Sequence, residues 1–148
     1  LAASTSLRVV NLAVPGATTQ SALAQIPRIA GSNAFVLLEI GGNDLLDRID
    51  AATFESHLDQ LVSVLRANGH DVATFELPLF PFQNAYGRAQ RAVAKRHAVA
   101  LIPRRHFARV LGMPDGTLDG LHLTQKGHDE MARRVAALLR IESEPKPD

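Results

Sequence analysis

Cysteine is absent from the sequence, which excludes disulfide bonds, thiolate metal sites and a cysteine nucleophile. An excess of one charge is lacking as well: 16 Lys and Arg stand against 15 Asp and Glu, so no strong field attracts nucleic acid or an anionic membrane. The longest apolar runs, such as Ala34–Leu38, fall far short of the roughly 20 residues that cross a bilayer. We therefore expect no nucleic-acid partner and no transmembrane segment.

The first residues, Leu1-Ala2-Ala3-Ser4, include no initiator Met and no signal-peptide pattern, so we expect the sequence to be processed, trimmed or incomplete. Apolar residues make up 46% of the chain and charged residues 21%, a balance typical of one globular domain. We assign that domain to residues 1–141 and regard 142–148 as a polar, proline-containing tail. Because a chain without cysteine suits a reducing or an oxidising compartment, its localisation stays open.

Predicted strands alternate with predicted helices along the chain. Apolar and β-branched runs predict strands at residues 7–14, 34–40, 71–77 and 99–102. Helical spacing and capping residues predict helices at 19–30, 53–68, 86–97 and 105–111, and a last helix from about Thr124. The strands are apolar throughout rather than at every second residue, which indicates a parallel sheet buried on both faces. The predicted fold class is therefore α/β.

Ligand sites in such sheets form from the loops that follow the carboxyl ends of the strands. The loops in question comprise residues 15–19, 41–44, 78–82 and 115–122. In the first, Gly16 offers a backbone amide that a substrate can approach closely because no Cβ blocks it. Strand-to-helix turns at glycine are nevertheless common in α/β proteins, so a purely structural role stays open.

Two further loops carry groups suited to acyl transfer. In Gly41–Asp44 the side chain of Asn43 can donate to a developing oxyanion, although turn formation and helix capping explain the same residue types equally well. Before the last helix, Asp119 stands three residues ahead of His122, and a carboxylate so placed can fix the tautomer of a general base. An isolated pair of this kind is more often a pair of surface turn residues.

Taken together, Asn11–Gly16, Gly41–Asp44 and Asp119–His122 resemble blocks II, III and V of the GDSL or SGNH hydrolases in order, spacing and placement. The segments Leu77–Gly87 and Val99–Pro103 are similar to the thioesterase, lysophospholipase and arylesterase branch. The resemblance covers essentially the whole chain. It implies a flavodoxin-like three-layer α/β/α sandwich with a mostly parallel sheet.

The resemblance also implies a role for each matching residue. His122 would be the general base and Asp119 would orient it, while the Gly16 amide and the Asn43 side chain would form the oxyanion hole. Three neighbours of Asn43 are expected to support its loop: Asp44, Gly41 and Gly42. Three side chains after the third strand are candidates for the wall of an acyl pocket, with loop packing as the alternative: Leu79, Phe80 and Phe82. Neither a cofactor nor a metal site is expected.

One element of the family pattern, the Gly-Asp-Ser turn of block I, is missing from this chain. None of its seven serines lies in Gly-Asp-Ser or Gly-x-Ser-x-Gly. In a flavodoxin-like sheet the first strand would lie between the strands predicted at 7–14 and 34–40. Without it, buried groups would stay unsatisfied at about 1–3 kcal/mol each, against a total stability of about 5–15 kcal/mol. We therefore expect a separate N-terminal peptide, a neighbouring chain or upstream residues to supply the strand and the nucleophilic serine.

The sequence thus predicts a serine hydrolase that cleaves small carboxylic esters or thioesters through an acyl-enzyme. A carbohydrate O-acetyl esterase is an alternative substrate class. An SGNH-like domain that only binds its ligand is an alternative of a different kind, motivated by the absent nucleophile.

Overall fold

The computed structural model describes residues 8–78, 84–120 and 122–139. The chain forms two compact units, one of residues 12–104 and the other of residues 105–148 together with 1–11. Three predicted acyl-pocket residues, Leu79, Phe80 and Phe82, lie outside the described residues, and so does the predicted tail 142–148.

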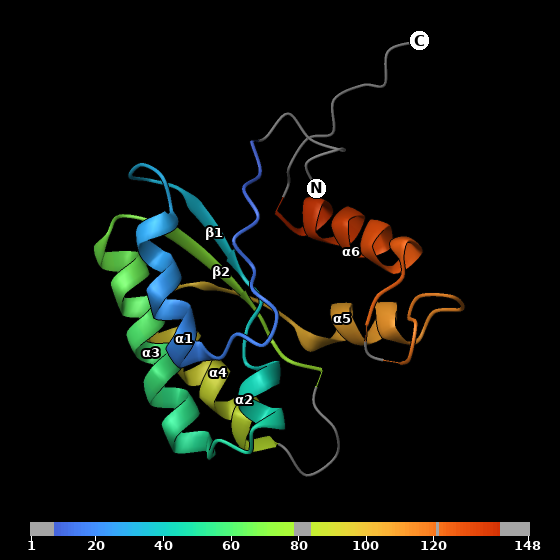
Figure 1. The fold of residues 1–148 in the computed structure, drawn as a ribbon, viewed down its shortest axis with the longest axis horizontal. Helices are drawn as coiled ribbons and strands as arrows, with labels where there is room; N and C mark the ends of the chain where they lie inside the picture. Colours follow the sequence, from blue (N-terminus) through green and yellow to red (C-terminus); the bar gives the residue numbers. More distant parts are fainter. Residues whose placement is uncertain (1–7, 79–83, 121, 140–148) are drawn as a thin grey trace. The chain divides into compact units, whose positions relative to one another are not determined.

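A parallel sheet forms the centre of the larger unit (Figure 1). Its order is β1 (Phe35–Leu38), β2 (Asp71–Phe75) and β3 (Ala100–Ile102), with Val36 opposite Val72 and Thr74 opposite Leu101. The α/β class and the parallel sheet are therefore confirmed. Burial on both faces holds for the central strand β2, whereas β1 lies at an edge and leaves Phe35 53% exposed.

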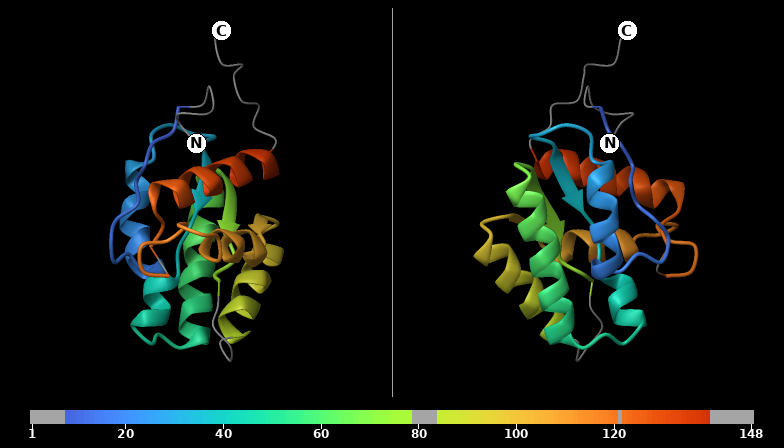
Figure 2. Two further views of the ribbon diagram at one scale, coloured as in Figure 1. Left: turned by 90° about the vertical axis from the view of Figure 1, so that its right-hand side faces the viewer. Right: turned by 60° about the vertical axis from the view of Figure 1, so that its left-hand side comes forward.

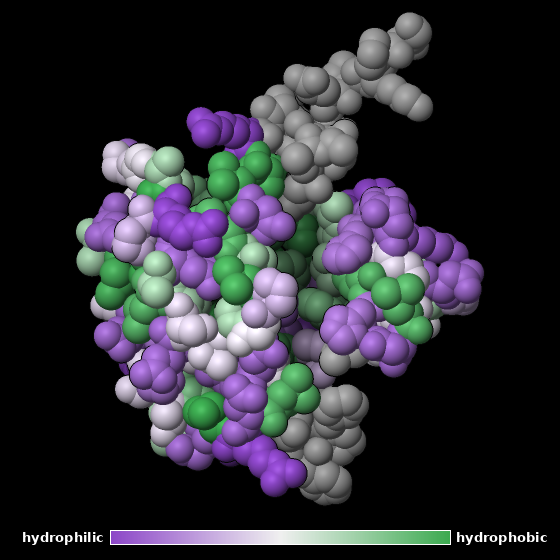
Figure 3. Space-filling view, in the orientation of Figure 1, coloured by the Kyte–Doolittle hydropathy of each residue, from purple (hydrophilic) through white to green (hydrophobic). Residues whose placement is uncertain are grey.

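The strand predicted at residues 7–14 is wrong over its described part, 8–14, which contains no strand. Val9, Val10 and Val14 are 46%, 58% and 45% exposed. Figure 3 shows hydrophobic residues open to solvent among the hydrophilic ones on one face of the molecule. A strand needs a neighbour that completes its ladder of hydrogen bonds, and the ladders of the described sheet join β1 to β2 and β2 to β3. Apolar character alone was therefore insufficient to predict the conformation of this segment.

The helix predicted at 19–30 is shorter and changes type. α1 (Thr19–Ala22) continues directly into the 3-10 helix η2 (Leu23–Arg28), which contains Pro27. Proline has no N–H for the helical ladder, and its ring crowds the preceding turn, which explains why an α-helix does not persist here.

The other helices of this unit are α2 (Gly42–Leu46), α3 (Ala51–Ala67) and α4 (Asn84–Arg96). The ranges predicted for α3 and α4 agree within two residues at each end. α2 is a single short helix that the residue pattern indicated only as a turn. Asp50 caps α3 by accepting hydrogen bonds from the backbone N–H groups of Ala52 and Thr53, each at 3.0 Å.

Two apolar clusters hold the helices on the sheet, and α1, α3 and α4 run beside one another in the views of Figures 1 and 2. The first cluster joins α3 to α4, with the rings of Phe54 and Tyr86 stacked at 4.5 Å between centroids. The second joins α1, η2, α3 and β2 through Ala22, Ile26, Leu61, Leu65 and Val72. Their burial is the main favourable term for this unit, because apolar area removed from water stabilises by about 25 cal/mol per Å².

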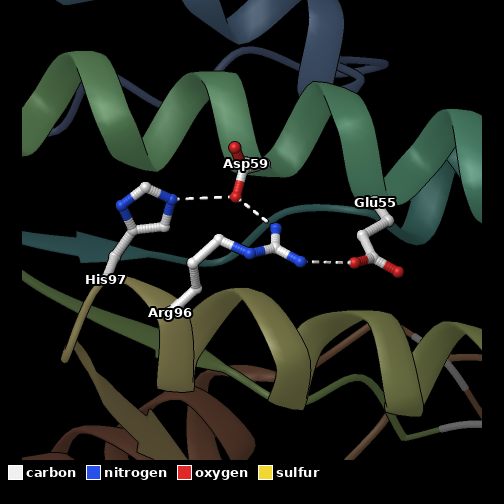
Figure 4. A network of polar contacts seen from close by, with 4 residues as sticks. All are labelled: Glu55, Asp59, Arg96 and His97. Atoms are coloured by element: carbon white, nitrogen blue, oxygen red, sulfur yellow. Dashed lines mark hydrogen bonds and ion pairs between the residues drawn. The ribbon is translucent and has the colours of Figure 1, made fainter.

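Charged side chains add an outer connection between α3 and α4 (Figure 4). Arg96 donates to Glu55 at 3.0 Å and to Asp59 at 2.5 Å, and the His97 ring lies 2.8 Å from Asp59. Burial alone would raise the pKa of Asp59, but the hydrogen bonds from Arg96 and His97 outweigh it and leave that pKa below its usual value. The hydrogen bonds that Arg96 makes to Asp59 and Glu55 raise the pKa of Arg96.

The smaller unit is built from α5 (Arg104–Leu111), whose first residue belongs to the larger unit, and α6 (Gln125–Leu138). Val110 and Val135 are almost completely buried. Within the described ranges, no helix of either unit has the length and apolar character that crossing a bilayer requires.

Candidate active site

The first predicted oxyanion donor, Gly16, lies in an exposed turn of the larger unit. Its φ of +75° is a left-handed conformation that glycine adopts without steric cost, and the turn closes with a 3.1 Å bond from the Ala17 N–H to the Val14 carbonyl. Thr18 then caps α1 by accepting from the Ser21 N–H at 3.2 Å. Gly16 is therefore presented on a short turn directly before a helix.

Asn43 reaches this turn from α2. Its Nδ2 donates to the carbonyl of Ala17 at 2.9 Å, which ties α2 to the residue after Gly16. A carboxamide nitrogen carries two hydrogens, so this bond leaves a second N–H for a ligand. The structure thus brings the two predicted oxyanion donors into one group, joined through Ala17.

Asp44, predicted to support the loop, is fully buried beside Thr19 at 0% exposure for both residues. The Thr19 backbone N–H donates to Oδ2 at 2.9 Å and to Oδ1 at 3.2 Å, and the Thr19 hydroxyl donates to Oδ1 at 2.5 Å. Thr19 is a residue that the sequence analysis missed, because a threonine in the first turn of a helix has no distinctive local signal.

The two glycines before Asn43 have different surroundings. Gly41 has φ of +108°, and a Cβ there would lie 2.8 Å from Cε2 of Phe54 and 3.1 Å from Cδ1 of Leu77. Gly42 begins α2 with open space around the position where a Cβ would stand. The geometry therefore requires glycine at 41 and tolerates a side chain at 42.

Tyr86 closes the group from α4. Its hydroxyl has two backbone carbonyls as hydrogen-bond acceptors within reach, that of Asp44 at 3.3 Å and that of Ile49. Burial, followed by the negative charges of Asp44 and Asp50, raises the pKa of Tyr86, so the phenol keeps the proton that it donates. The sequence placed Tyr86 at the start of a helix and within the segment Leu77–Gly87 of the family resemblance, but gave its hydroxyl no role. A buried hydroxyl's need for a partner becomes visible only in three dimensions.

The predicted base and its orienting carboxylate form a second group, in the smaller unit. Nδ1 of His122 lies 2.7 Å from Oδ2 of Asp119, and the His122 backbone N–H donates to Oδ1 of Asp119 at 2.8 Å. The two side chains are 72% and 55% exposed. One carboxylate therefore holds both the ring and the backbone of the histidine.

A small hairpin-like loop presents this pair. Thr117 and Leu123 form an isolated antiparallel bridge, and the Leu118 N–H donates to the His122 carbonyl at 2.7 Å. Gly120 turns the chain between them with φ of +86°. The loop's geometry explains why a spacing of three residues brings Asp119 and His122 together.

The end of the loop is anchored at the start of α6. Thr124 caps the helix by accepting from the Gly127 N–H at 3.1 Å, and its hydroxyl donates to the Asp115 carbonyl at 2.6 Å. Its own N–H donates to the Gly116 carbonyl at 3.0 Å. A Cβ on Gly127 would overlap that same carbonyl, so α6 starts in close backbone contact with the loop.

The arrangement determines which nitrogen of His122 can act as a base. Because a carboxylate only accepts hydrogen bonds, the 2.7 Å contact requires the proton on Nδ1, and the lone pair of the neutral ring is then on Nε2. Across the described residues, no three His, Asp or Glu side chains are grouped to hold a metal ion. A lone pair on Nε2 can accept a proton, and the N–H groups of Gly16 and Asn43 are hydrogen-bond donors suited to an anionic oxygen.

A sequence model described as the GDSL-like Lipase/Acylhydrolase family matches residues 1–130. Esterase TesA of Pseudomonas aeruginosa is 32% identical over 124 residues, which cover 78% of this chain and 61% of that protein. An arylesterase of Vibrio mimicus is 25% identical over 136 residues, covering 86% of this chain and 68% of that protein. The chain thus spans less than two thirds of the first relative and about two thirds of the second.

Solved structures show the same relationship in three dimensions. The crystal structure of TesA matches with a TM-score of 0.79 and 28% identity, over 90% of this chain and 78% of that one. The psychrotrophic esterase EstA from Pseudoalteromonas sp. matches with a TM-score of 0.73 and 21% identity, over 88% and 78% of the two chains, a likeness of fold.

Proposed function

Because the chain belongs to the GDSL-like lipase/acylhydrolase family, we propose that the protein hydrolyses carboxylic ester or thioester bonds of small molecules through an acyl-enzyme. The observation that carries the proposal is the contact of 2.7 Å between Nδ1 of His122 and Asp119 on an exposed loop. A domain that only binds a ligand has no chemical need for a histidine oriented in this way. The names of the two relatives, an esterase and an arylesterase, point to the same class of reaction.

In the first half of the reaction a serine hydroxyl attacks the substrate carbonyl, and Nε2 of His122 accepts the hydroxyl proton. The tetrahedral intermediate collapses when the bond to the alcohol or thiol breaks, and the imidazolium returns its proton to that leaving group. In the second half a water molecule attacks the acyl-serine, gives a proton to Nε2, and the carboxylic acid departs as the serine regains its proton. Asp119 keeps the ring in the required tautomer and stabilises the imidazolium in both halves.

The anionic oxygen of the tetrahedral intermediate would receive hydrogen bonds from the Gly16 amide and the Asn43 carboxamide. Preorganised donors of this kind commonly contribute about 10²–10³-fold each to turnover. Their support in this chain is the bond of 2.9 Å between Asn43 and Ala17, which brings the carboxamide to the Gly16 turn.

We assign the nucleophile to a segment outside these 148 residues, since none of the seven serines lies in a nucleophile motif. The unpaired outer edge of β1 in the described sheet supports this assignment, because an additional strand there would give Phe35 and its neighbours a partner. The serine-bearing strand would then bury an edge that this chain leaves exposed.

The test uses the complete encoded protein, treated with a fluorophosphonate and assayed on p-nitrophenyl and thioester substrates. We expect turnover, with the label on a serine outside the 148 residues when the digested protein is mapped by mass spectrometry. His122→Ala is expected to lower kcat by about 10³-fold or more. His128→Ala is the matched control because His128 is an exposed histidine of the adjacent helix, and it should retain full turnover.

The outcomes separate the parts of the proposal. A label on one of the seven serines refutes the assignment of the nucleophile to another segment but agrees with the proposed esterase activity. Near wild-type turnover in His122→Ala refutes the assignment of the base. Absence of both label and turnover refutes the proposed function and favours the binding domain.

A further inference from the structure

Thr19 and Asp44 lie directly behind the two candidate oxyanion donors. Both residues are completely buried, whereas Gly16 is exposed and Asn43 is half-buried. The pair joins α1 to α2 across 25 positions of sequence through both the backbone and the hydroxyl of Thr19. We name this pair the Thr19–Asp44 lock.

The lock is a costly way to fill a space in the core. Removing a carboxylate from water carries a large free-energy penalty, and one threonine offers few compensating bonds. An apolar pair of similar size would avoid that penalty. Two charge-assisted bonds to one N–H and one hydroxyl instead fix the relative position of α1 and α2, because such bonds are short and directional.

The residues of the lock are close in sequence to both candidate oxyanion donors. Asn43, the residue before Asp44, bonds to Ala17, the residue after Gly16, at 2.9 Å. The Gly16 turn and the first turn of α2 are therefore joined twice, once by Asn43 to Ala17 and once by Asp44 to Thr19. Without the buried Thr19–Asp44 bonds, only the half-buried bond from Asn43 to Ala17 would hold the two donors at their relative positions.

We propose that the Thr19–Asp44 lock positions the Gly16 amide and the Asn43 carboxamide for the developing oxyanion, which makes Thr19 a positioning residue for acyl transfer. The inference rests on the proposed function, because it concerns the same site. Preorganisation of donors is worth most in the transition state, so loss of the lock should lower kcat and leave KM nearly unchanged.

The experiment compares three variants of the complete protein on a soluble ester. Thr19→Val keeps the shape and the backbone N–H but removes the hydroxyl, and we expect kcat to fall about ten- to a hundredfold with KM within about twofold. Thr19→Ser restores a hydroxyl and should return kcat to within about threefold of the wild type. Thr18→Val is the matched control: it removes the cap of α1 and leaves the lock intact.

A second comparison separates positioning from general damage. If the lock acts largely through Asn43, adding Thr19→Val to Asn43→Ala should lower kcat by no more than about twofold, whereas an independent structural role would multiply the two losses. Should Thr19→Val fail to fold, Asp44→Asn, which removes one acceptor oxygen with little change of shape, takes its place in both comparisons.

Wild-type turnover distinguishes a failure of this inference from a failure of the proposed function. If the complete wild-type protein has no esterase activity, the proposed function is wrong and the lock has no reaction to serve. If the wild type is active, the lock is rejected when Thr19→Val matches Thr18→Val in kcat. A loss that multiplies with that of Asn43→Ala rejects the positioning of Asn43 by the lock.

Discussion

The two groups of candidate catalytic residues are held in opposite ways. Around Asn43, buried hydrogen bonds reach α2 from α1 and α4, and Asp44 is fully enclosed. Around His122, the bonds come from within its own loop, and the ring is 72% exposed. One group is fixed by long-range contacts and the other by local ones.

The difference corresponds to the work proposed for each group. Oxyanion donors stabilise the transition state because they are already oriented before the negative charge develops, so they need a rigid environment. A general base exchanges protons with a nucleophile, a leaving group and water in turn, and needs access to solvent and a defined tautomer more than enclosure. Mutations in the two groups should therefore separate activity from stability.

Asp119→Asn should have the largest effect, and on activity alone. An amide can present N–H instead of an acceptor to Nδ1, which favours the wrong tautomer of His122, and the comparable change in serine proteases lowers kcat about 10⁴-fold. Because Asp119 is 55% exposed, the free energy of unfolding should change by less than about 0.5 kcal/mol. Steady-state kinetics and urea unfolding measure the two quantities.

Asp115→Asn supplies the control for that change. Asp115 lies in the same loop with φ of +58°, a conformation that asparagine also tolerates, and its side chain is 87% exposed. If Asp115→Asn lowers kcat as much as Asp119→Asn, loss of charge rather than loss of the tautomer explains both results.

Gly41→Ala should have the largest effect on stability. The φ of +108° and the Phe54 ring 2.8 Å from the added Cβ combine backbone strain with overpacking, and we expect a loss of about 3 kcal/mol in the free energy of unfolding. Gly42→Ala, at an open helical position, should instead leave stability unchanged or raise it by about 0.5–1 kcal/mol. Equal effects of the two changes in urea unfolding would show that position 41 is not as tightly enclosed as described.

Elements with local signals were predictable from the sequence. The spacing of Phe54, Leu58, Leu61 and Leu65 predicted α3, and each of these side chains is almost completely buried. The loop of Asp119 was found for the same reason, since its partners lie within three residues of one another. Its exposure agrees with the surface position that such turn residues usually have.

Long-range contacts are what the sequence could not supply. The pairing of Thr19 with Asp44 depends on the packing of two helices, and the absence of a strand at residues 8–14 depends on which neighbours are present to complete a ladder. Neither the Thr19–Asp44 pairing nor the absence of that strand can be predicted from the apolar residues or the turn residues of a local segment. The oxyanion group was therefore predicted as residues, while the contacts that position them were not.

Thr124→Ala tests how strongly the loop of the base is anchored. The change removes the cap of α6 and the bond from the Thr124 hydroxyl to the Asp115 carbonyl, and we expect a loss of about 1 kcal/mol in the free energy of unfolding. The exposed neighbour Gln125, changed to alanine, should alter stability by less than about 0.5 kcal/mol. A loss above about 3 kcal/mol would show that the His122 loop is held as firmly as the group around Asn43, which would contradict the contrast drawn between them.

Asp59→Asn should have the smallest effect on the free energy of unfolding. It tests whether exposed ion pairs stabilise the helices as much as buried hydrogen bonds do. Asp59 accepts from Arg96 at 2.5 Å and contacts His97 at 2.8 Å (Figure 4), yet its side chain is 33% exposed. Exposed pairs of this kind stabilise by about 0.5 kcal/mol, because solvent screens the attraction and ordering the side chains opposes it.

The sign of the pH dependence follows from the lowered pKa of Asp59. Its contribution is fully present above the pKa of an unfolded aspartate, about 3.9, and is lost as the pH falls through the lower pKa of the folded state. The difference in unfolding free energy between wild type and Asp59→Asn should therefore be constant near pH 5 and shrink toward pH 2, and high salt should also reduce it.

Asp71→Asn is the control for this change. Asp71 pairs with Arg66 and is 83% exposed, so its substitution should change the free energy of unfolding by less than Asp59→Asn does. A loss above about 2 kcal/mol for Asp59→Asn would mean that surface networks hold these helices as firmly as the buried contacts around Asp44.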